Sequence, residues 1–244
     1  MIRMHVDAVF TLYDGFTGKA MPPSAVRVML DGQRFRPEYR QGGYLVFINL
    51  EPGNHKVVFS AAYYGDETAD FETMRNSRVE RVLSLKPGLN YPFGGKATRL
   101  TAIVTAKGKC TPKKRVALAA GDGPEIRVAQ DSAAAGDSEF KLYVRGELAR
   151  LKLPGEYLIV DGKNSEVCTL SAVNEGTGRF AAPLIYEHKR GKALILSQTY
   201  TTDENGVFTA FFRRPAGVHA FVSENSILLS RELEEGENEM EINI

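Results

Sequence analysis

Four histidines and two cysteines are the residues of this sequence best suited to bind a metal or act as a nucleophile: His5, His55, His188, His219, Cys110 and Cys168. Their spacing matches neither an H-E-x-x-H zinc motif nor a paired-cysteine metal motif. The sequence also contains no G-x-S-x-G nucleophile elbow, no G-x-x-x-x-G-K-[ST] phosphate loop and no G-x-G-x-x-G turn. We therefore expect no catalytic residue, no bound cofactor and no metal ligand.

Some of these polar residues have a simpler structural interpretation. His55 and His219 each follow a Pro/Gly turn, and although two such imidazoles could share a metal, we favour packing of each ring against its turn. His188 lies in a turn rich in Lys and Arg, and we expect it to be solvated. The acidic run that ends in Asn205-Gly206 lacks EF-hand spacing, and Asn-Gly between strands is typical of a hairpin turn. An enzyme whose site is built between domains without a motif stays an alternative.

The composition is that of a globular protein without a strong charge bias. The 244 residues include 31 Lys and Arg against 30 Asp and Glu, which gives a net charge of +1 and no global field for nucleic acid or an anionic membrane. The sequence begins MIRMHVDAVF, which lacks a basic and apolar leader, and no apolar run reaches the roughly 20 residues of a membrane helix. We therefore expect a cytoplasmic protein, or a part of a virion-like particle assembled in the cytoplasm, with no membrane contact.

The elements that would have to position any functional residue are predicted to be strands. Apolar and polar residues alternate with a period of two over residues 26–30, 57–60, 142–145 and 207–213. Gly-containing turn signals such as Asp31-Gly32, Pro52-Gly53 and Asn205-Gly206 separate these runs. Residues 66–81 are the main exception, and there we expect a short helix or a long loop. Many short strands with Gly/Pro turns indicate an all-β fold of sandwiches or small barrels.

Three short sequence blocks occur twice in the same order. Gly18-Lys19-x-x-Pro22-x-x-x-Val26 matches residues 108–116, Gly43 to His55 matches residues 206–219, and Leu85-x-x-Gly88-x-Asn90 matches residues 233–238. In the first copy about 15 residues separate the first two blocks, and in the second about 90 do, so the second copy carries an insertion. We therefore expect domains at residues 1–98, at 99–120 plus 197–244, and an inserted small β-domain at 121–196.

These blocks resemble the carboxypeptidase regulatory-like domains, which are transthyretin-like β-sandwiches. The second copy carries the resemblance best, in Thr202-Asp203-Glu204-Asn205-Gly206-Val207-Phe208, followed by Pro215-Ala216-Gly217-Val218-His219 and then by Leu233-Glu234-Glu235-Gly236-Glu237-Asn238. In the first copy Gln41-Gly42-Gly43-Tyr44 replaces the T-D-x-x-G-x-F turn. The resemblance implies two tandem transthyretin-like sandwiches, the second interrupted by a small β-barrel or β-meander, and it says little about function.

The inserted segment has a resemblance of its own. Gly155-Glu156-Tyr157-Leu158-Ile159-Val160-Asp161-Gly162, then Thr177-Gly178 leading to Pro183-Leu184, and then His188-Lys189-Arg190-Gly191 are similar to small β-modules of phage-tail and contractile injection baseplate proteins. The resemblance implies a module that docks onto other subunits of a particle. Ordinary hairpin chemistry in a generic barrel or meander is the alternative.

Two loops are the candidate partner contacts. Tyr63, Tyr64 and Asp66 lie on a segment by which the first copy exceeds the second, and exposed tyrosines often contribute strongly to protein interfaces. Tyr186, Lys189 and Arg190 form the corresponding candidate in the insertion. Their basic run lacks the interleaved aromatic residues of a nucleic-acid site, so we expect a protein partner.

We therefore expect a non-enzymatic docking component, an accessory or baseplate-associated part of a phage tail or contractile injection-like particle. Its expected partners are other protein subunits, with no nucleic acid and no small-molecule substrate. Two alternatives stay open: a carbohydrate- or cell-surface-associated binding module, and the enzyme with an unrecognised site between domains.

Overall fold

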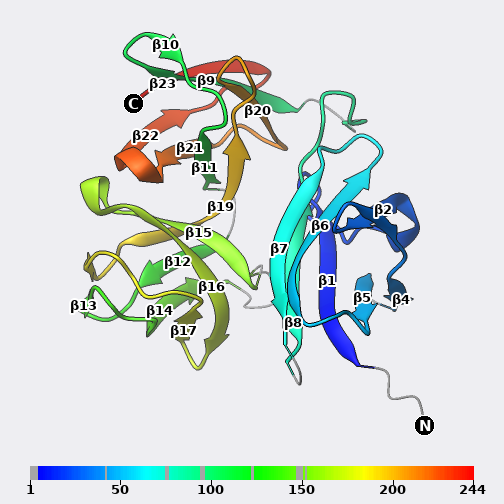
Figure 1. The fold of residues 1–244 in the computed structure, drawn as a ribbon. Coiled ribbons are helices and arrows are strands. Elements are labelled where there is room, and N and C mark those ends of the chain that lie inside the picture. The colour runs from blue at the N-terminus through cyan, green and yellow to red at the C-terminus, as the bar shows by residue number, and fades with distance from the viewer. Residues whose placement is uncertain are drawn as a thin grey trace. The chain divides into compact units, whose positions relative to one another are not determined.

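The computed structural model describes residues 5–41, 43–74, 77–93, 97–121, 124–146, 151 and 153–244, and they form almost only strands (Figure 1). The chain divides into two compact units, Met1–Gly95 and Lys96–Ile244. No helix among the described residues is long and apolar enough to cross a membrane. The all-β expectation is confirmed, and the two units are described separately below.

The first unit is a β-sandwich of two four-stranded sheets, with strand orders β4-β5-β1-β8 and β3-β2-β6-β7. All neighbouring strands are antiparallel except β1 and β8, which are parallel. Its elements are β1 (Val6–Asp14), the 3-10 turn η1 (Pro23–Ala25), β2 (Val26–Leu30), β3 (Gln33–Phe35), β4 (Glu38–Arg40), β5 (Tyr44–Ile48), β6 (Gly53–Ala61), β7 (Glu67–Thr73) and β8 (Val79–Leu85).

Aromatic side chains fill the space between these two sheets. Phe10 of β1 is fully buried, and its ring centroid lies 5.2 Å from Phe47, 5.1 Å from Phe59 and 5.3 Å from Phe71. These rings come from both sheets, and alternate residues of each strand point inward, so the period of two in the sequence becomes one buried face. Residues 66–81 contribute β7 and the start of β8, so the expected helix or loop is wrong there.

The second unit contains a second sandwich of the same plan. Strand β9 lies between antiparallel β20 and parallel β23, and the facing strands follow the order β19-β11-β21-β22. The strands of this sandwich are β9 (Thr98–Ala106), β10 (Lys109–Cys110), β11 (Arg115–Ala120), β19 (Ala193–Thr201), β20 (Val207–Phe212), β21 (Gly217–Val222), β22 (Ile227–Glu232) and β23 (Glu237–Asn243), with η4 at Ser223–Asn225.

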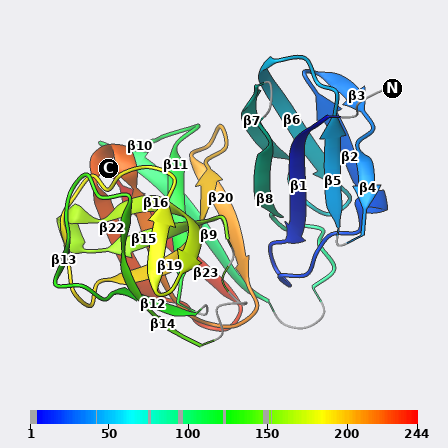
Figure 2. The same cartoon turned by 90° about the horizontal axis from the view of Figure 1, so that it is seen from below.

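The same second unit contains a closed six-stranded barrel. Its strands follow the order β12-β14-β17-β16-β15-β19, and β12 pairs with β19 to close the ring (Figure 2). Closure leaves no free sheet edge around the barrel. The remaining elements of this part are β12 (Glu125–Val128), β13 (Ser132–Ala133), β14 (Glu139–Arg145), β15 (Gly155–Val160), η3 (Gly162–Asn164), β16 (Glu166–Asn174), β17 (Thr177–Phe180) and β18 (His188–Lys189).

Strand β19 belongs to the barrel and to the second sandwich at once. Its first part pairs with β15 and β12 of the barrel, and its second part, from Ser197 to Thr201, pairs with β11 of the sandwich. Buried Ala119, Leu158 and Phe221 pack together where the two parts meet. The barrel is therefore fixed to its sandwich by a continuous strand and a small apolar core.

The barrel is inserted at a place where the first sandwich has only a short turn. There the two-residue turn Asp31-Gly32 joins β2 to β3, with φ of 50° and 79° as a tight hairpin requires. In the second sandwich residues 121–192 take the place of that turn, between β11 and β19. The expectation of two sandwiches, the second interrupted by a small barrel, is confirmed, while the domain boundaries 1–98, 99–120 plus 197–244, and 121–196 stay predictions.

One of the three repeated sequence blocks is not equivalent in the two sandwiches. Gly43 and Gly206 both precede the strand that pairs antiparallel with the central β1 or β9. By contrast, Leu85 ends the last strand of the first sandwich, whereas Leu233 precedes the last strand of the second. The evidence for the repeat is therefore the shared strand order, in which the last strand of each sandwich pairs in parallel with its first. The third sequence match does not mark equivalent positions.

Candidate interaction surfaces

The first predicted contact loop is divided between exposed and packed residues. Tyr63 is 58% exposed, and Asp66 is exposed beside it. Tyr64 instead packs with its ring centroid 5.3 Å from that of Tyr91, whose hydroxyl donates a hydrogen bond of 2.6 Å to Asp14. Tyr64 thus belongs to the aromatic cluster that fixes the end of the first unit, and only Tyr63 and Asp66 are available to a partner.

The second predicted contact loop lies on the barrel. Lys189 and Arg190 are exposed and Tyr186 is half-buried. Both basic groups already have partners: the ammonium of Lys189 lies 2.5 Å from Glu187, and Arg190 donates from Nε to the carbonyl of Ala129 at 2.8 Å. Because their charge is partly neutralised within the loop, they provide a weaker basic surface than the sequence suggests.

His188 lies within this loop but is fully buried, so the expected solvated histidine is wrong. Its Nδ1 is 3.0 Å from an oxygen of Asp161, and its Nε2 is 2.9 Å from an oxygen of Glu166. Glu166 also accepts the backbone N–H groups of Ile185 and Tyr186. The imidazole and this carboxylate therefore hold the loop that follows Pro183 against the barrel wall.

The charge state of this cluster follows from its contacts. Burial by itself lowers the pKa of His188, but the hydrogen bonds and negative charges of Glu166 and Asp161 outweigh burial and raise that pKa above its usual 6.5. Burial raises the pKa of Glu166, and the hydrogen bonds from His188 and two backbone amides more than reverse it, so this pKa is lowered. The two carboxylates therefore favour the protonated form of His188, and their contacts with it give it a structural role.

Metal binding has no support in the described part of the chain. No group of three His, Cys, Asp or Glu side chains is arranged there so that it could hold a metal ion. Cys168 is buried and Cys110 is exposed, and both are free thiols. His55 contacts Asp31 and the carbonyl of Glu51, whereas His219 contacts Ser230. The two histidines thus have separate partners: His55 contacts the residue before its own Pro/Gly turn, whereas the partner of His219 lies on β22.

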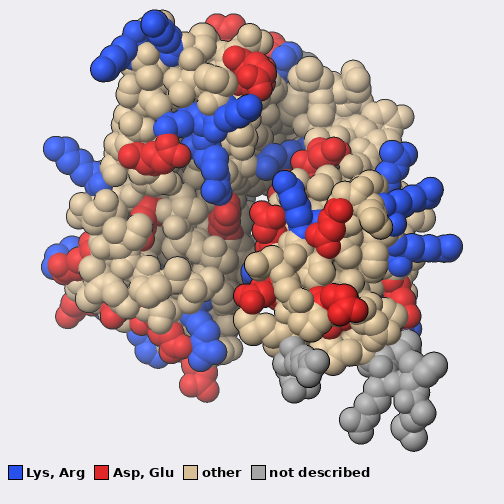
Figure 3. Space-filling model, viewed as in Figure 1, with Lys and Arg blue, Asp and Glu red and all other residues tan. Residues whose placement is uncertain are grey.

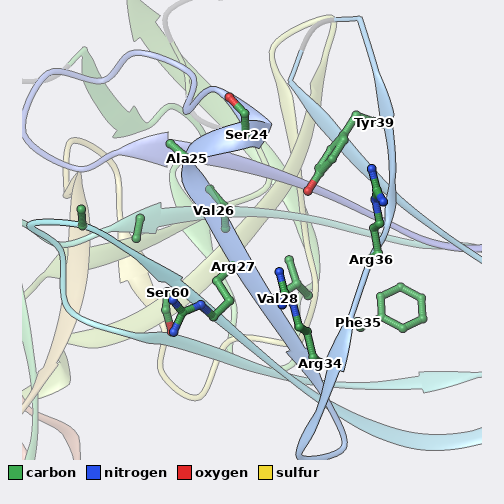
Figure 4. Close-up of a pocket in the computed structure, with 12 residues that line it drawn as sticks. Ser24, Ala25, Val26, Arg27, Val28, Arg34, Phe35, Arg36, Tyr39 and Ser60 are labelled. Atoms are coloured by element: carbon green, nitrogen blue, oxygen red, sulfur yellow. The ribbon is translucent and has the colours of Figure 1, made fainter.

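A groove on the first sandwich is a surface that the sequence analysis did not find. It has a volume of about 1040 Å³, and its walls come from η1, β2, β3, the link to β4 and the end of β6 (Figure 4). Figure 3 shows Lys and Arg side chains projecting over the part of this unit where Figure 1 places β2. The lining residues are Ser24, Ala25, Val26, Arg27, Val28, Arg34, Phe35, Arg36, Tyr39, Ser60, Ala61 and Ala62.

Three of these lining residues are arginines without a carboxylate partner. Arg27, Arg34 and Arg36 are exposed, and none forms an ion pair within the described part of the chain. Neighbouring Arg40, in contrast, is paired with Glu38 at 2.5 Å. Tyr39, 44% exposed, lies on the same groove. The groove therefore presents uncompensated positive charge beside an aromatic side chain, a combination suited to an anionic partner.

Comparisons with known proteins give only distant structural likenesses. No protein-family model matches the chain, and no curated protein sequence matches it. Among solved structures, the major pilin subunit of Bacillus cereus matches with 11% identity and a TM-score of 0.29, over 94% of this chain and 67% of that one. A shaft pilin of Lactobacillus rhamnosus GG matches with 10% identity and a TM-score of 0.28, over 98% and 96% of the two chains.

A minor pilin of Streptococcus agalactiae is a further match, with 10% identity and a TM-score of 0.21, over 97% of this chain and 94% of that one. TM-scores this low support no functional argument. None of these matches is a phage-tail, baseplate or carboxypeptidase regulatory-like protein. The matched proteins are pilin subunits, and by this comparison the expected cytoplasmic location is wrong and is withdrawn.

Proposed function

We propose that this protein is a non-enzymatic structural component that docks onto other protein subunits of a larger assembly. The observation that carries the proposal is the arginine-lined groove of the first sandwich. The equivalent place in the second sandwich is occupied by β19, so the same fold is closed in one copy and open in the other. Positive charge beside an open sheet edge opposes chance pairing with other strands, and it favours a partner of opposite charge that covers the edge.

The architecture of the second unit supports the same proposal. Because β19 runs from the barrel into the sandwich, a load applied to the barrel passes directly into the sandwich through backbone hydrogen bonds. The exposed loop around Ile185, which is 68% exposed, is held by the buried cluster of His188. A rigid module that displays a fixed loop suits docking. We keep the loop residues Tyr186, Lys189 and Arg190 as a proposed second contact, and Tyr63 and Asp66 as a proposed contact on the first unit.

The more specific setting, an accessory part of a phage tail or contractile injection-like particle, rests on the sequence resemblance of the barrel segment alone. It predicts that genes for sheath, tube and baseplate proteins adjoin the gene for this chain.

The proposed function is tested by the native state of the protein. An epitope-tagged chain purified gently from the cells that produce it should elute in a large complex, and native mass spectrometry should give a constant stoichiometry with the same partner subunits in repeated preparations. Recovery of the tagged chain only as a free monomer would contradict the proposal. So would turnover by the purified chain of ester, peptide or glycoside substrates, provided that the activity is lost on heat denaturation.

A further inference from the structure

The arginine groove marks a strand position that is filled in one sandwich and vacant in the other. In the second sandwich β19 pairs with five residues of β11, Arg115 to Ala119. In the first sandwich β3 pairs with only three residues of β2, Val28 to Leu30. The shared Gly-Lys-x-x-Pro-x-x-x-Val block aligns Val26 with Val116. Val116 faces Tyr200 of β19, whereas Val26 faces no strand on that side.

Pro37 explains why β3 ends early. In the register that pairs Val28 with Phe35, the residue opposite Val26 would be Pro37. Proline has no backbone N–H, so it cannot donate to the ladder at that position. The chain instead crosses to the other sheet and enters β4 at Glu38. A proline therefore vacates the position that Tyr200 occupies in the second sandwich.

The backbone of β2 offers a free acceptor in this vacant position. The N–H of Asp31 donates to the carbonyl of Lys56 at 2.8 Å, so the odd-numbered residues of β2 direct their backbone groups toward β6. Val26 therefore directs its groups to the other side, where β3 has ended. Its N–H donates to the carbonyl of Pro23 within η1, which leaves the carbonyl of Val26 facing the groove.

The side chains around this vacant position favour a negatively charged occupant. Val28 is buried, so the residues next to it in β2 point to the outer face of the sheet. Arg27, and by the pairing register Arg34 of β3, therefore lie on that outer face. Figure 4 shows Arg36 and Tyr39 along the opposite wall and Arg27 beside Ser60. An extended segment in the groove would therefore meet guanidinium groups on more than one side.

We infer that the vacant strand position beside Val26 and Arg27, at the start of β2, binds an extended acidic segment of a partner protein, which joins the sheet where β3 has ended. This inference rests on the proposed docking function and names the chemistry of the partner. A polypeptide fits better than a nucleic acid, because the open carbonyl of Val26 requires an N–H donor at strand spacing. The lining also offers few rings for base stacking, since Tyr39 is exposed and Phe35 is half-buried. An extended segment of about seven residues spans roughly 23 Å, enough to pair at Val26 and continue along the arginine-lined walls of the groove.

The test uses the full chain and a fluorescein-labelled peptide of sequence Glu-Thr-Glu-Val-Glu-Thr-Glu, with binding followed by fluorescence anisotropy. We expect saturable binding that weakens between 20 and about 150 mM salt, since exposed ion pairs are screened. The peptide with Lys in place of Glu should bind at least tenfold more weakly. Two further peptides test the added strand, one N-methylated at the odd-numbered residues and one at the even-numbered residues. Because N-methylation removes backbone N–H donors, at least one of these two peptides should also bind at least tenfold more weakly than the parent peptide.

Matched variants locate the binding site. Arg27→Gln, Arg34→Gln and Arg36→Gln combined should reduce affinity at least tenfold, while Arg81→Gln on β8, another exposed arginine of the first unit without an ion pair in the described part of the chain, should change it less than twofold. A cooperative unfolding transition like that of the parent chain shows that each variant is folded. If the triple variant does not fold, the three single variants are compared with Arg81→Gln instead.

Several results would overturn the inference. Equal binding of both N-methylated peptides and the parent peptide would show attraction by charge without strand addition. Equal losses from the triple variant and Arg81→Gln would place binding elsewhere. Direct binding of inorganic polyphosphate to the groove, with no binding of the acidic peptide, would assign the groove to a different anion. If the native complex still forms with the triple variant, the inference fails while the proposed docking function stands.

Discussion

The two sandwiches of this chain share a strand order and differ at one strand position. In the second sandwich, nine-residue β19 fills the position beside β11 and continues into the barrel. In the first, three-residue β3 stops at Phe35, beside a groove lined by three arginines that form no ion pair with any residue the structure describes. The comparison teaches that the same edge can be filled in one copy, where it anchors a barrel, and stay open in the other, where Pro37 ends the pairing; recognition at the open edge is our proposal.

The largest expected effect comes from giving the second sandwich the proline of the first. Tyr200→Pro should destabilise the second unit by about 4 kcal/mol, because it removes a ladder hydrogen bond opposite Val116 and the stacking of the Tyr200 ring on Phe208. Denaturant unfolding followed by near-ultraviolet circular dichroism measures this loss. Tyr200→Phe, which keeps the ring and the backbone N–H, should cost less than about 1 kcal/mol, and an equal loss in both variants would refute the ladder explanation.

A second prediction compares the turns that precede equivalent strands. Gly206 has φ of 74°, and a Cβ there would lie 2.8 Å from the backbone nitrogen of Thr111 and 3.0 Å from the carbonyl oxygen of Val104. Gly43 has φ of 83°, but its nearest neighbours would be at 3.6 Å or more. Gly206→Ala should therefore cost about 3 kcal/mol and Gly43→Ala about 1 kcal/mol. Unfolding free energies of the two variants check this order, and the reverse order would contradict the described packing.

A third prediction concerns the barrel, which the first sandwich lacks. The folded pKa of His188 is raised above 6.5, so its stabilisation is present below the unfolded pKa and is lost as pH rises through the folded value. The folded pKa of Glu166 is lowered below 4.5, so its contribution is present above the unfolded pKa and is lost as pH falls through the folded value. The cluster should therefore stabilise the barrel most between about pH 4.5 and 6.5.

The matched variant for this pH dependence is His188→Gln. Its destabilisation, about 2 kcal/mol at pH 6, should shrink as pH rises above the folded pKa of His188. Thermal unfolding of the parent chain and the variant from pH 4 to 9 gives this difference directly. A difference that does not change with pH would mean that His188 is neutral in the folded barrel. Lys189→Gln, at the exposed neighbouring position, should leave the unfolding free energy within about 0.5 kcal/mol at every pH.

The smallest expected effect is the reciprocal change in the first sandwich. Pro37→Ala should cost about 1 kcal/mol, because the buried Pro37 side chain loses some packing but no ladder hydrogen bond exists there to lose. Denaturant unfolding again provides the measurement. A loss as large as that of Tyr200→Pro would show that Pro37 has a packing role equal to that of a paired strand residue, and the comparison between the two edges would then fail.

The sequence predicted the elements better than the surfaces. Alternation of apolar and polar residues identified strands such as Val26–Leu30 and Val207–Phe212, because burial of one face enforces the period of two. The extra length between Val116 and Gly206 identified the insertion. Residues 66–81 were misread, since the alternation in β7 is formed by short or charged residues such as Ala69 and Glu72, and only Phe71 and Thr73 are fully buried.

The surfaces depend on pairing between distant residues, which no local pattern contains. His188 lies among Lys and Arg in the sequence and was expected in solvent, but Asp161 and Glu166 bury it from positions 27 and 22 residues away. The third sequence block misled for a similar reason: Asn238 holds the turn before β23 through bonds to Glu234, whereas Asn90 is exposed after β8. The groove had one visible signal, which is Pro37 close behind Arg34 and Arg36.

The most direct test of the vacant strand position is a map of where the acidic peptide binds. Amide chemical shifts of the full ¹⁵N-labelled chain should be recorded while Glu-Thr-Glu-Val-Glu-Thr-Glu is added. The account predicts that the largest changes fall on residues 24–28 and 33–36, with the second sandwich unaffected around β19. Changes centred on the second unit, or spread evenly over exposed basic residues of both units, would contradict it.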